Sequence, residues 1–397
     1  MYKKRFSSKR RGRPFQKKGN FKRGGRLRKN QNIDFSRFIN KSANTEEAEH
    51  FIPEHHFEDF MISDTLKKNI IAKGYKLPTP IQDRTIPCAL EGRDLVGIAN
   101  TGTGKTAAFL IPLIDKALKN PSEQIIIIAP TRELAFQING EFRDFTAGMN
   151  LFSVCAVGGA YIGLQIRALR NKNNFIIGTP GRLKDLIERK HIKLSNFSTL
   201  VLDEADRMLD MGFVNDMRFI VLGMPAIHHT LFFSATPSRE IESLISEFLK
   251  KPARISVKTG DTPKNIEQDV MKIGRGEIKL DVLHNLLNNK EFRKVLVFGR
   301  TKHEVENLSC MLANRGFKAE SIHGDKNHIQ RQRALRRFKE NQTRILVATD
   351  IAARGLDIDG ISHVINYDIP ATYDDYVHRI GRTGRGINRG KALTFIQ

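Results

Sequence analysis

Short runs of consecutive apolar residues recur along the chain from about residue 53, and each is only long enough to form one strand. Amphipathic segments such as Thr106–Lys119, Arg132–Phe145 and Arg182–Arg189 separate these runs. Strands that are apolar throughout and alternate with helices are typical of a parallel sheet covered on both faces. In the first part of the chain the expected strands are Leu95–Ala99, Ile125–Ala129, Val154–Val157, Phe175–Ile177, Thr199–Leu202 and Leu231–Phe233.

The segment 258–265 interrupts this pattern with the polar sequence KTGDTPKN, as a linker would. We therefore predict two tandem α/β domains, 51–257 and 266–397, each a parallel sheet with helices on both faces. Ligands of such sheets bind beyond the carboxyl ends of the strands, so functional residues are expected there. The strands expected in the second domain are Val295–Phe298, Ala319–Ile322, Ile345–Ala348, His363–Tyr367 and Ala392–Ile396.

The N-terminal 41 residues carry 16 Lys and Arg and one acid, which is +15 of the total formal charge of +23. With so little aliphatic content, residues 1–50 are expected to form a disordered basic tail. Cations bind phosphates and aromatic rings stack on bases, so the tail suits single-stranded nucleic acid. A solubility tail, or one that binds any polyanion including a membrane surface, is the alternative. The aromatic and Arg–Gly elements are Phe6, Phe15, Phe21 and the RGGR segment 23–26.

Several protein classes are excluded by composition. The apolar runs are far too short to cross a bilayer, and the basic N-terminus has no apolar stretch behind it to make a secretory signal. Cys88, Cys155 and Cys310 are widely spaced and form no CxxC pair, which argues against a disulfide framework or a cysteine zinc site. We expect a cytoplasmic protein.

The first candidate site follows the strand Leu95–Ala99, where the sequence NTGTGKT precedes a helix. This strand–loop–helix context is that of a phosphate-binding loop, with Ala99 in place of the first glycine of the strict motif. Backbone N–H groups of such a loop surround phosphates, its lysine reaches the β- and γ-phosphates, and its hydroxyl binds Mg²⁺. A chance Gly–Thr turn before a helix is the alternative. The loop residues are Thr101, Gly102, Thr103, Gly104, Lys105 and Thr106.

The sequence Asp203-Glu204-Ala205-Asp206 follows another apolar strand. A carboxylate at the end of a strand in the same sheet can reach Mg²⁺ held by the loop, directly or through water, which is the role expected of Asp203. Glu204 is placed to orient and deprotonate an attacking water. Acidic residues that merely cap a helix are the alternative explanation.

These segments, with others in the same order, resemble the DEAD-box ATP-dependent RNA helicase family of superfamily 2, in its bacterial form. The series is GYKLPTPIQ, ANTGTGKT, PTRELA, Gly158-Gly159, TPGR, DEAD, SAT, ATDIAARGLD and HRIGRTGR, from about residue 57 to the end of the chain. The resemblance implies two RecA-like domains, ATP and Mg²⁺ as cofactors, and RNA as partner.

The resemblance also implies roles for single residues. Gln82 resembles the glutamine that reads the adenine edge, and Phe57 the aromatic residue that stacks on the base, although a core position is the alternative for Phe57. Ser234, Thr236 and Asp206 resemble the element that couples the ATP state to RNA.

In the second domain, Asp357 resembles the residue that bonds the ATP ribose, and His378 the residue that helps to tie the domains together. Arg382 and Arg385 resemble the arginine fingers of the family. A planar, permanently charged guanidinium suits the charge on a transferring phosphoryl group. An ordinary basic loop is the alternative for these arginines.

The residues that the resemblance assigns to RNA are small, hydroxyl-bearing or cationic, which suits phosphate and sugar contacts rather than base edges. They are Arg132, Gly159, Thr179, Arg182, Arg300, Gly324 and Thr349.

The sequence predicts an ATP hydrolase in which RNA favours closure of the two domains, with local unwinding of short duplexes and remodelling of RNA–protein complexes. An ATP-gated RNA clamp or annealing chaperone with little unwinding is the alternative, and a DNA translocase is a third. We expect a monomer that binds RNA largely without regard to sequence, has ribosomal or other ribonucleoprotein partners, and does not bind membranes. The cationic segment Arg331–Lys339 is interpreted as a solvated helix face.

Overall fold

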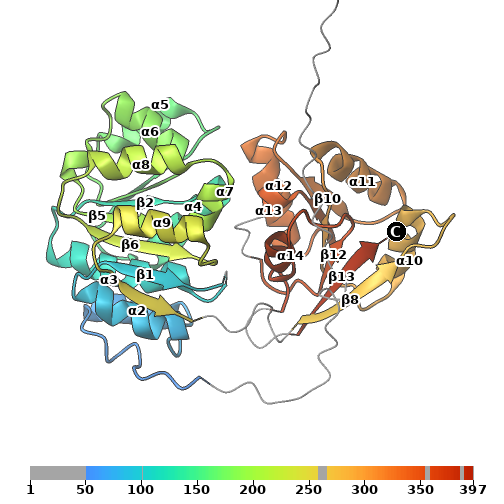
Figure 1. The fold of residues 1–397 in the computed structure, drawn as a ribbon, viewed down its shortest axis with the longest axis horizontal. Coiled ribbons are helices and arrows are strands. Elements are labelled where there is room, and N and C mark those ends of the chain that lie inside the picture. Colours follow the sequence, from blue (N-terminus) through green and yellow to red (C-terminus); the bar gives the residue numbers. More distant parts are fainter. Residues whose placement is uncertain (1–50, 101, 258–265, 354–357, 385–388, 397) are drawn as a thin grey trace, which may run out of the picture. The chain divides into compact units, whose positions relative to one another are not determined.

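The computed structural model describes residues 51–100, 102–257, 266–353, 358–384 and 389–396. The predicted tail 1–50, the predicted linker 258–265, Thr101, Asp357 and Arg385 lie outside the described residues. Within them, the chain forms two parallel β-sheets, each flanked by helices (Figure 1). No described helix is both long enough and apolar enough to span a membrane.

The first sheet has seven strands in the order β3-β4-β2-β5-β6-β1-β7, and all pairs of neighbours run parallel. Its strands are β1 Leu95–Ile98, β2 Ile125–Ile128, β3 Ser153–Ala156, β4 Phe175–Gly178, β5 Thr199–Leu202, β6 His229–Ser234 and β7 Ala253–Ser256. The helices before and between them are α1 Asp64–Ala72, α2 Pro80–Leu90, α3 Lys105–Lys119, α4 Arg132–Phe145, α5 Ile162–Leu169, α6 Pro180–Glu188, the 3₁₀ turn η2 Leu194–Asn196, α7 Ala205–Asp210, α8 Val214–Gly223 and α9 Arg239–Phe248.

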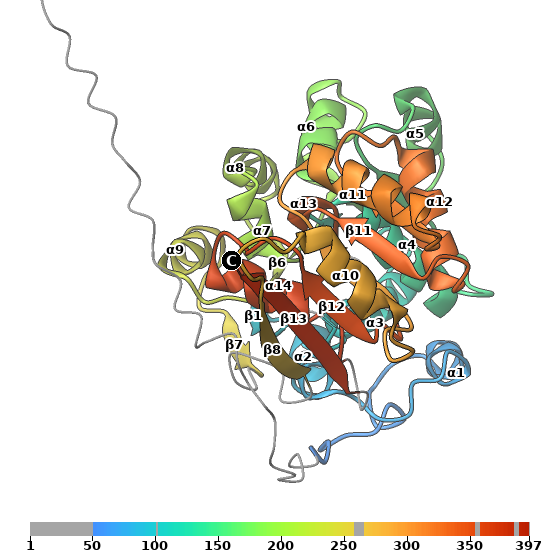
Figure 2. The ribbon, with the colours of Figure 1, turned by 90° about the vertical axis from the view of Figure 1, so that its right-hand side faces the viewer.

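The second sheet has six strands in the order β10-β11-β9-β12-β13-β8, again all parallel. Strands β13 and β8 lie side by side at its edge (Figure 2). Its strands are β8 Ile266–Lys272, β9 Val295–Phe298, β10 Ala319–Ile322, β11 Ile345–Ala348, β12 His363–Asn366 and β13 Gly390–Ile396. Its helices are α10 Lys279–Asn288, α11 Lys302–Asn314, α12 His328–Lys339, α13 Asp350–Ala353 and α14 Tyr373–Ile380.

Each sheet is buried on both faces, as the continuous apolar runs predict. In β2, Ile125 and Ile127 join one core cluster while Ile126 and Ile128 join the cluster on the opposite face. Strand β9 divides in the same way, because alternate side chains of a strand point to opposite faces. The prediction of two parallel-sheet α/β domains is therefore confirmed.

Two strands were not predicted, β7 and β8, and both lie at sheet edges. In β8, Ile266 and Gln268 are buried while Glu267 and Asp269 are exposed, so the strand is not apolar throughout. An edge strand can keep one face in water, so its sequence need not contain a continuous apolar run.

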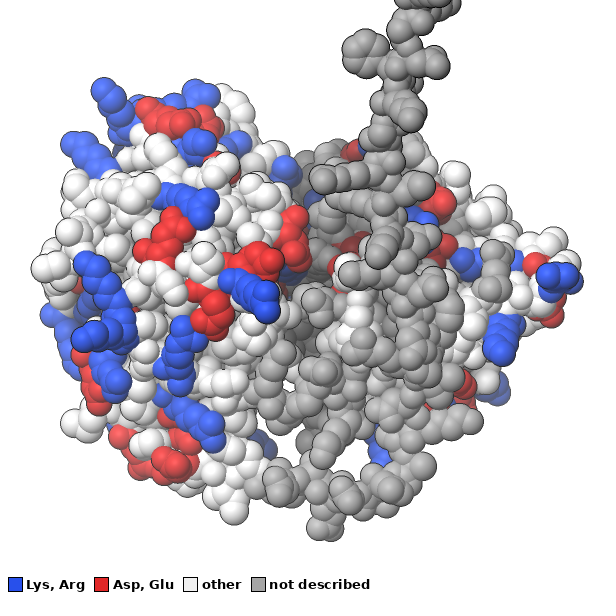
Figure 3. All heavy atoms as spheres, viewed as in Figure 1, with Lys and Arg blue, Asp and Glu red and all other residues white. Residues whose placement is uncertain are grey.

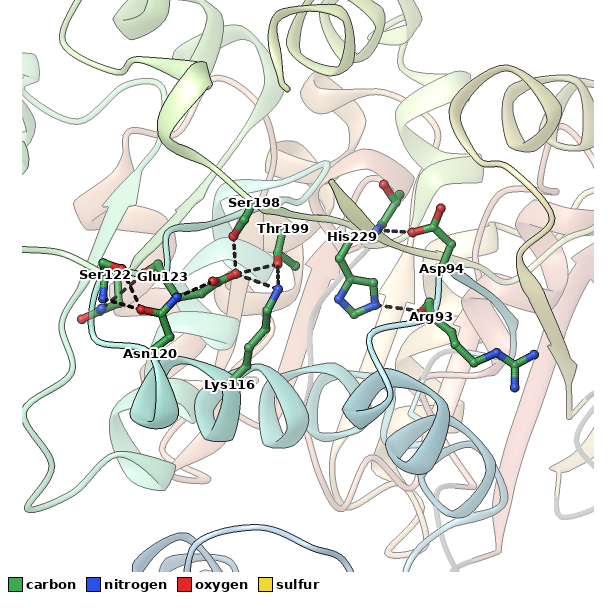
Figure 4. A network of polar contacts seen from close by, with 11 residues as sticks. Arg93, Asp94, Lys116, Asn120, Ser122, Glu123, Ser198, Thr199 and His229 are labelled. Carbon is green, nitrogen blue, oxygen red and sulfur yellow. Dashed lines mark hydrogen bonds and ion pairs between the residues drawn. The ribbon is translucent and has the colours of Figure 1, made fainter. Parts of the chain in front are cut away.

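Polar side chains hold the amino ends of the strands in the first sheet (Figure 4). Glu123, just before β2, lies 2.7 Å from the ammonium of Lys116 on α3 and accepts a hydrogen bond of 3.1 Å from Thr199 on β5. Burial raises the pKa of Glu123, but Lys116 and Ser198 outweigh it and leave that pKa below its ordinary value. This network fastens a helix to the sheet at the edge opposite the predicted ligand sites.

Basic and acidic side chains are interspersed over the face of the first domain that Figure 3 shows. Exposed ion pairs of this domain include Arg218 with Glu247 and Arg254 with Glu242, both at 2.8 Å. Exposed pairs of this kind contribute little to stability. The surface charge of this domain is thus largely balanced locally, unlike that of the N-terminal segment of the sequence.

Candidate active site

The loop after β1 has the backbone shape expected of a phosphate-binding loop. Gly102 and Gly104 have φ of 83° and 92°, a left-handed region that glycine adopts without strain. Lys105 begins α3, is 6% exposed, and donates a hydrogen bond of 2.9 Å to the carbonyl oxygen of Ala99. The lysine is therefore held within its own loop, and half-buried Thr106 follows it on the first turn of the helix.

Gln82 is joined to this loop directly. Its side-chain nitrogen donates to the carbonyl oxygen of Gly104 at 3.1 Å, and its side-chain oxygen accepts from the backbone of Thr79 at 3.0 Å. Thr79 and Gln82 form a capping box at the start of α2. The structure thus brings Gln82 to the phosphate-binding loop, a contact that the sequence did not indicate.

Phe57 lies in the core of the first domain. Its side chain is 1% exposed, and its ring makes edge contacts with Phe60 and Tyr75, with centroids 6.0 and 5.8 Å away. This burial matches the alternative interpretation of Phe57 as a core residue. Stacking on a base stays a prediction, and it requires the ring to be uncovered.

Asp203 and Glu204 follow β5, the second neighbour of β1 in the sheet. Asp203 is 2% exposed, and burial raises its pKa to about 7, even though the positive charge of Lys105 acts against this. No group of three or more His, Cys, Asp or Glu in the described residues could hold a metal ion. The buried carboxylate of Asp203 and the hydroxyl of Thr106 are oxygen groups of the kind that fit Mg²⁺ bound together with substrate phosphates, and a cation would favour the charged form of Asp203.

Glu204 has a left-handed backbone, with φ of 51°, and is 5% exposed. Its carboxylate forms an ion pair with Arg207, one turn later on α7. Burial would raise the pKa of Glu204, but Arg207 and Lys105 outweigh it and hold that pKa below its ordinary value. Glu204 is thus an ionised carboxylate fixed beside the loop, and Arg207 is a partner that sequence reasoning missed.

Asp206 connects α7 to the residues after β6. One oxygen of its carboxylate accepts hydrogen bonds from the backbone N–H groups of Ala235 and Thr236, both at 3.0 Å, and from the Thr236 hydroxyl at 3.1 Å. The Ser234 hydroxyl donates to the carbonyl oxygen of Thr236 at 2.9 Å. The structure therefore brings together Asp206, Ser234 and Thr236, three residues grouped by the sequence prediction.

The residues assigned to RNA in the first domain gather at the ends of β2, β3 and β4. A Cβ atom added to Gly159, whose φ is +73°, would overlap the guanidinium of Arg132, so these two residues are in close contact. Arg182 donates a hydrogen bond of 3.3 Å to the carbonyl oxygen of Ala160, and Thr179 is the residue before the first turn of the same helix, α6. This cluster of cations and small residues suits a phosphate backbone.

In the second domain, Arg300, Gly324 and Thr349 follow β9, β10 and β11, which are neighbours in the sheet. The backbone N–H of Arg300 donates to Asp368 at 3.0 Å. Half-buried His378 lies on α14, and the buried Arg382 just after it donates to the carbonyl oxygen of His378 at 3.3 Å.

Arg379 is a further residue that sequence reasoning did not single out. It is 2% exposed, and its guanidinium binds the carboxylate of Asp350 through two hydrogen bonds of 2.5 and 2.8 Å. It also donates to the carbonyl oxygen of Asp368 at 2.6 Å. Arg379 therefore fixes α14, which carries His378, to the start of α13 after β11.

Comparison with known proteins places these residues in a family. Residues 79–244 match the family model of DEAD/DEAH box helicases, and residues 278–386 match that of the helicase conserved C-terminal domain. The chain is 47% identical over 342 residues to the DEAD-box ATP-dependent RNA helicase CshA of Bacillus subtilis, covering 86% of this chain and 69% of the relative. It is 46% identical over 343 residues to the ATP-dependent RNA helicase CshA of Listeria monocytogenes, covering 86% of this chain and 66% of the relative. The chain thus spans about two thirds of the length of these relatives.

Solved structures agree. Dbp5 of S. cerevisiae bound to RNA and ADP BeF3 is 29% identical, with a TM-score of 0.79 over 86% of this chain and 89% of that one. The DEAD-box helicase Mss116 bound to ssRNA and UDP-BeF is 28% identical, with a TM-score of 0.79 over 87% of this chain and 76% of that one. The predicted RecA-like fold is confirmed.

Proposed function

This chain belongs to the DEAD/DEAH box helicase family and is an ATP-dependent RNA helicase of the DEAD-box type, and we propose that RNA binding drives closure of its two domains and thereby ATP hydrolysis. The activity that follows is local separation of short RNA duplexes and remodelling of RNA–protein complexes. The proposed setting is the cytoplasm, with a monomeric protein acting on RNA largely independently of its sequence and in contact with ribosomal or other ribonucleoprotein partners.

The observation that carries this proposal is how residues divide along one edge of the first sheet. The candidate ATP residues follow β1 and β5, with the coupling residues Ser234 and Thr236 at the end of β6, whereas the candidate RNA residues follow β2, β3 and β4. In the strand order, β2 is directly beside β5, so the two groups share a border. A rigid sheet edge that carries both groups supports coupling between them.

The residues of the first domain have distinct tasks in hydrolysis. The backbone of Gly102–Gly104 surrounds the phosphates, with Thr101 and Thr103 beside them, and Lys105 leaves its bond to Ala99 to bind the β- and γ-phosphates. Thr106 and Asp203 would hold Mg²⁺, which neutralises charge on the phosphate oxygens. Glu204, held ionised, orients the attacking water and accepts its proton.

In this scheme the arginine fingers come from the second domain. We assign that task to Arg382 and Arg385 of the second domain, and binding of the ribose to Asp357. An arginine finger contributes roughly 10³–10⁵ to the rate, so an enzyme with its domains apart is nearly inactive. RNA bound across both domains favours the closed state and so stimulates hydrolysis, and ATP in turn tightens RNA binding.

The RNA contacts explain why sequence matters little. Arg132, Gly159, Thr179 and Arg182 in the first domain, with Arg300, Gly324 and Thr349 in the second, present backbone groups, hydroxyls and guanidinium groups. Such groups bind phosphate and sugar, which every RNA shares. Strand separation is the expected outcome when a single strand is held in a conformation that its duplex cannot adopt.

A strand-separation assay tests this proposal. A short RNA duplex with one labelled strand is mixed with the protein, ATP·Mg²⁺ and an excess of unlabelled competitor. We expect release of the labelled strand with ATP and none with Glu204→Gln at multiple turnovers. If the unaltered protein anneals the two strands but does not release the labelled strand with ATP, the clamp or chaperone function is supported instead.

A further inference from the structure

Helix α5 and its N-cap present two large apolar side chains to solvent. Tyr161, at its N-cap, is 75% exposed, and Leu164 is 66% exposed, whereas the one buried residue of the helix is the polar Gln165. Scattered exposed apolar residues are ordinary, but a buried polar residue beside an exposed apolar pair is informative. Ile162, Ile166 and Leu169 are only half-buried against the core.

Gln165 explains how such a helix is held. Its side-chain nitrogen donates a hydrogen bond of 3.0 Å to the carbonyl oxygen of Val157, the residue directly after β3. This bond fastens the inner face of α5 to the end of the strand. The outer face carries Tyr161 and Leu164, three residues apart and mostly exposed.

The ring of Tyr161 lies against the backbone of its own helix at Gly163. A Cβ atom added to Gly163 would lie 2.7 Å from Cε1 of Tyr161, so any larger residue would push the ring away. The tip of the ring, at Cε1, Cζ and the hydroxyl, thus lies near Gly163, while most of the side chain remains in solvent. An exposed aromatic ring that contacts its own helix in this way is a platform on which a nucleobase can stack.

The platform adjoins the candidate RNA cluster. Gly159, in contact with Arg132, and Ala160, whose carbonyl oxygen accepts a hydrogen bond from Arg182, immediately precede Tyr161 in the chain. In Figures 1 and 2, α5 lies at the same end of the first domain as α6, which carries Arg182. A strand bound by Arg132 and Arg182 therefore passes close to the N-terminus of α5.

Cations continue along the same helix. Arg167 and Arg170 are exposed, and neither forms an ion pair with a described residue. Arg167 follows Leu164 by three residues, so both lie on the outer face of α5. Exposed aromatic, aliphatic and cationic side chains on one helix face suit single-stranded nucleic acid, which offers both base faces and phosphates.

We propose that Tyr161 and Leu164 form a base-stacking platform for single-stranded RNA, extended by Arg167, beside the phosphate cluster of the first domain. This inference rests on the proposed function, because it takes RNA to be bound by Arg132 and Arg182. It adds a contact to bases where the other assigned contacts reach phosphate and sugar. Since every base has an aromatic face, the platform tolerates any sequence.

The test uses the full chain with Tyr161→Ala, Tyr161→Phe and the matched control Phe152→Ala. Phe152 is a 47% exposed aromatic residue just before β3, at the opposite end of the strand from Tyr161. The probe is a single-stranded RNA with one 2-aminopurine, moved along the strand in a series. With the unaltered protein, one position should show quenching by stacking, and Phe152→Ala and Tyr161→Phe should preserve it.

Tyr161→Ala should abolish that quenching and weaken RNA affinity about five- to one-hundredfold, the usual range for loss of one stacked base. The maximal RNA-stimulated ATPase rate at saturating RNA should stay unchanged. Equal affinity and quenching in Tyr161→Ala and the unaltered protein would overturn the platform. An unaltered protein whose ATPase ignores RNA would instead overturn the proposed function, so the two failures are distinguishable.

Discussion

Asp206 and Thr236 are joined by two hydrogen bonds, because the same carboxylate oxygen accepts from both the backbone N–H and the hydroxyl of Thr236. The same oxygen also accepts from the N–H of Ala235. Hydrogen bonds therefore join the acidic sequence after β5 directly to the residues after β6. In the proposed function, this oxygen links the nucleotide carboxylates to the loop after β6.

We predict that Asp206→Asn destabilises the first domain by about 1–3 kcal/mol, because an amide cannot satisfy three donors as a carboxylate does. Strand separation should fall more than basal ATP hydrolysis, since the variant loosens the coupling element. Chemical unfolding and the two rates measure this. The control is Asp216→Asn, whose half-buried carboxylate pairs with Lys184 at 3.1 Å and should cost under about 1 kcal/mol. Equal losses in both variants would contradict the prediction.

Gly104→Ala should abolish ATP binding. Gly104 has φ of +92°, and an added Cβ would overlap the side-chain nitrogen of Gln82. Gly92→Ala is the matched control, since Gly92 also has a positive φ, of 73°, but an added Cβ there meets nothing within 4 Å. Both variants carry backbone strain of about 1–2 kcal/mol, and only the first displaces Gln82. Nucleotide titrations in which the two variants bind ATP alike would refute the importance of this contact.

Arg379→Lys should destabilise the second domain by about 3–5 kcal/mol, because lysine cannot reproduce the two-pronged bond of this buried guanidinium to the half-buried carboxylate of Asp350. Arg315→Lys, at the more exposed pair with Asp281, is the control and should cost little. Unfolding followed in urea reports both. If Arg379→Lys lowers the free energy of unfolding no more than Arg315→Lys does, the bond to Asp350 contributes no more to stability than an exposed ion pair.

The stability of the unliganded first domain should depend on Asp203 in a pH-dependent way. Burial raises the pKa of Asp203 to about 7 from 3.8, so the folded state favours the protonated acid. That contribution is complete below pH 3.8 and is lost as pH rises through 7. Asp203→Asn should therefore raise the melting temperature more at pH 8 than at pH 5. An equal gain at both pH values would contradict the raised pKa.

The positions of the inner strands follow from sequence alone because burial on both faces leaves a simple signal. Thr199–Leu202, Val295–Phe298 and Ile345–Ala348, all inner strands, were predicted with the bounds that the structure shows. Edge strands β7 and β8 expose polar or charged residues at alternate positions, such as Arg254 and Ser256 in β7, so their apolar signal is weaker. A strand that is covered on both faces is therefore easier to predict from sequence than a strand with one face in water.

Site residues that lie together in one short segment were predictable from the sequence. Examples are the loop before α3 and the pair Asp203 and Glu204. Contacts between distant segments were not. The bond from Gln82 to Gly104 spans 22 residues, and that from Arg379 to Asp350 spans 29. Nothing local in either segment specifies its partner, because the partner is set by strand order. The pair Tyr161 and Leu164 follows Gly158-Gly159 closely in the sequence, but its exposure depends on how α5 packs on the domain.

The central claim is that RNA gates ATP hydrolysis, and one measurement tests it most directly. ATP hydrolysis by the full chain is measured with no nucleic acid, with single-stranded RNA and with DNA of the same sequence, beside Glu204→Gln. We predict a low basal rate, strong stimulation by RNA, little by DNA, and no stimulated rate in Glu204→Gln. A rate that is the same with and without RNA, while RNA is bound, would contradict the claim.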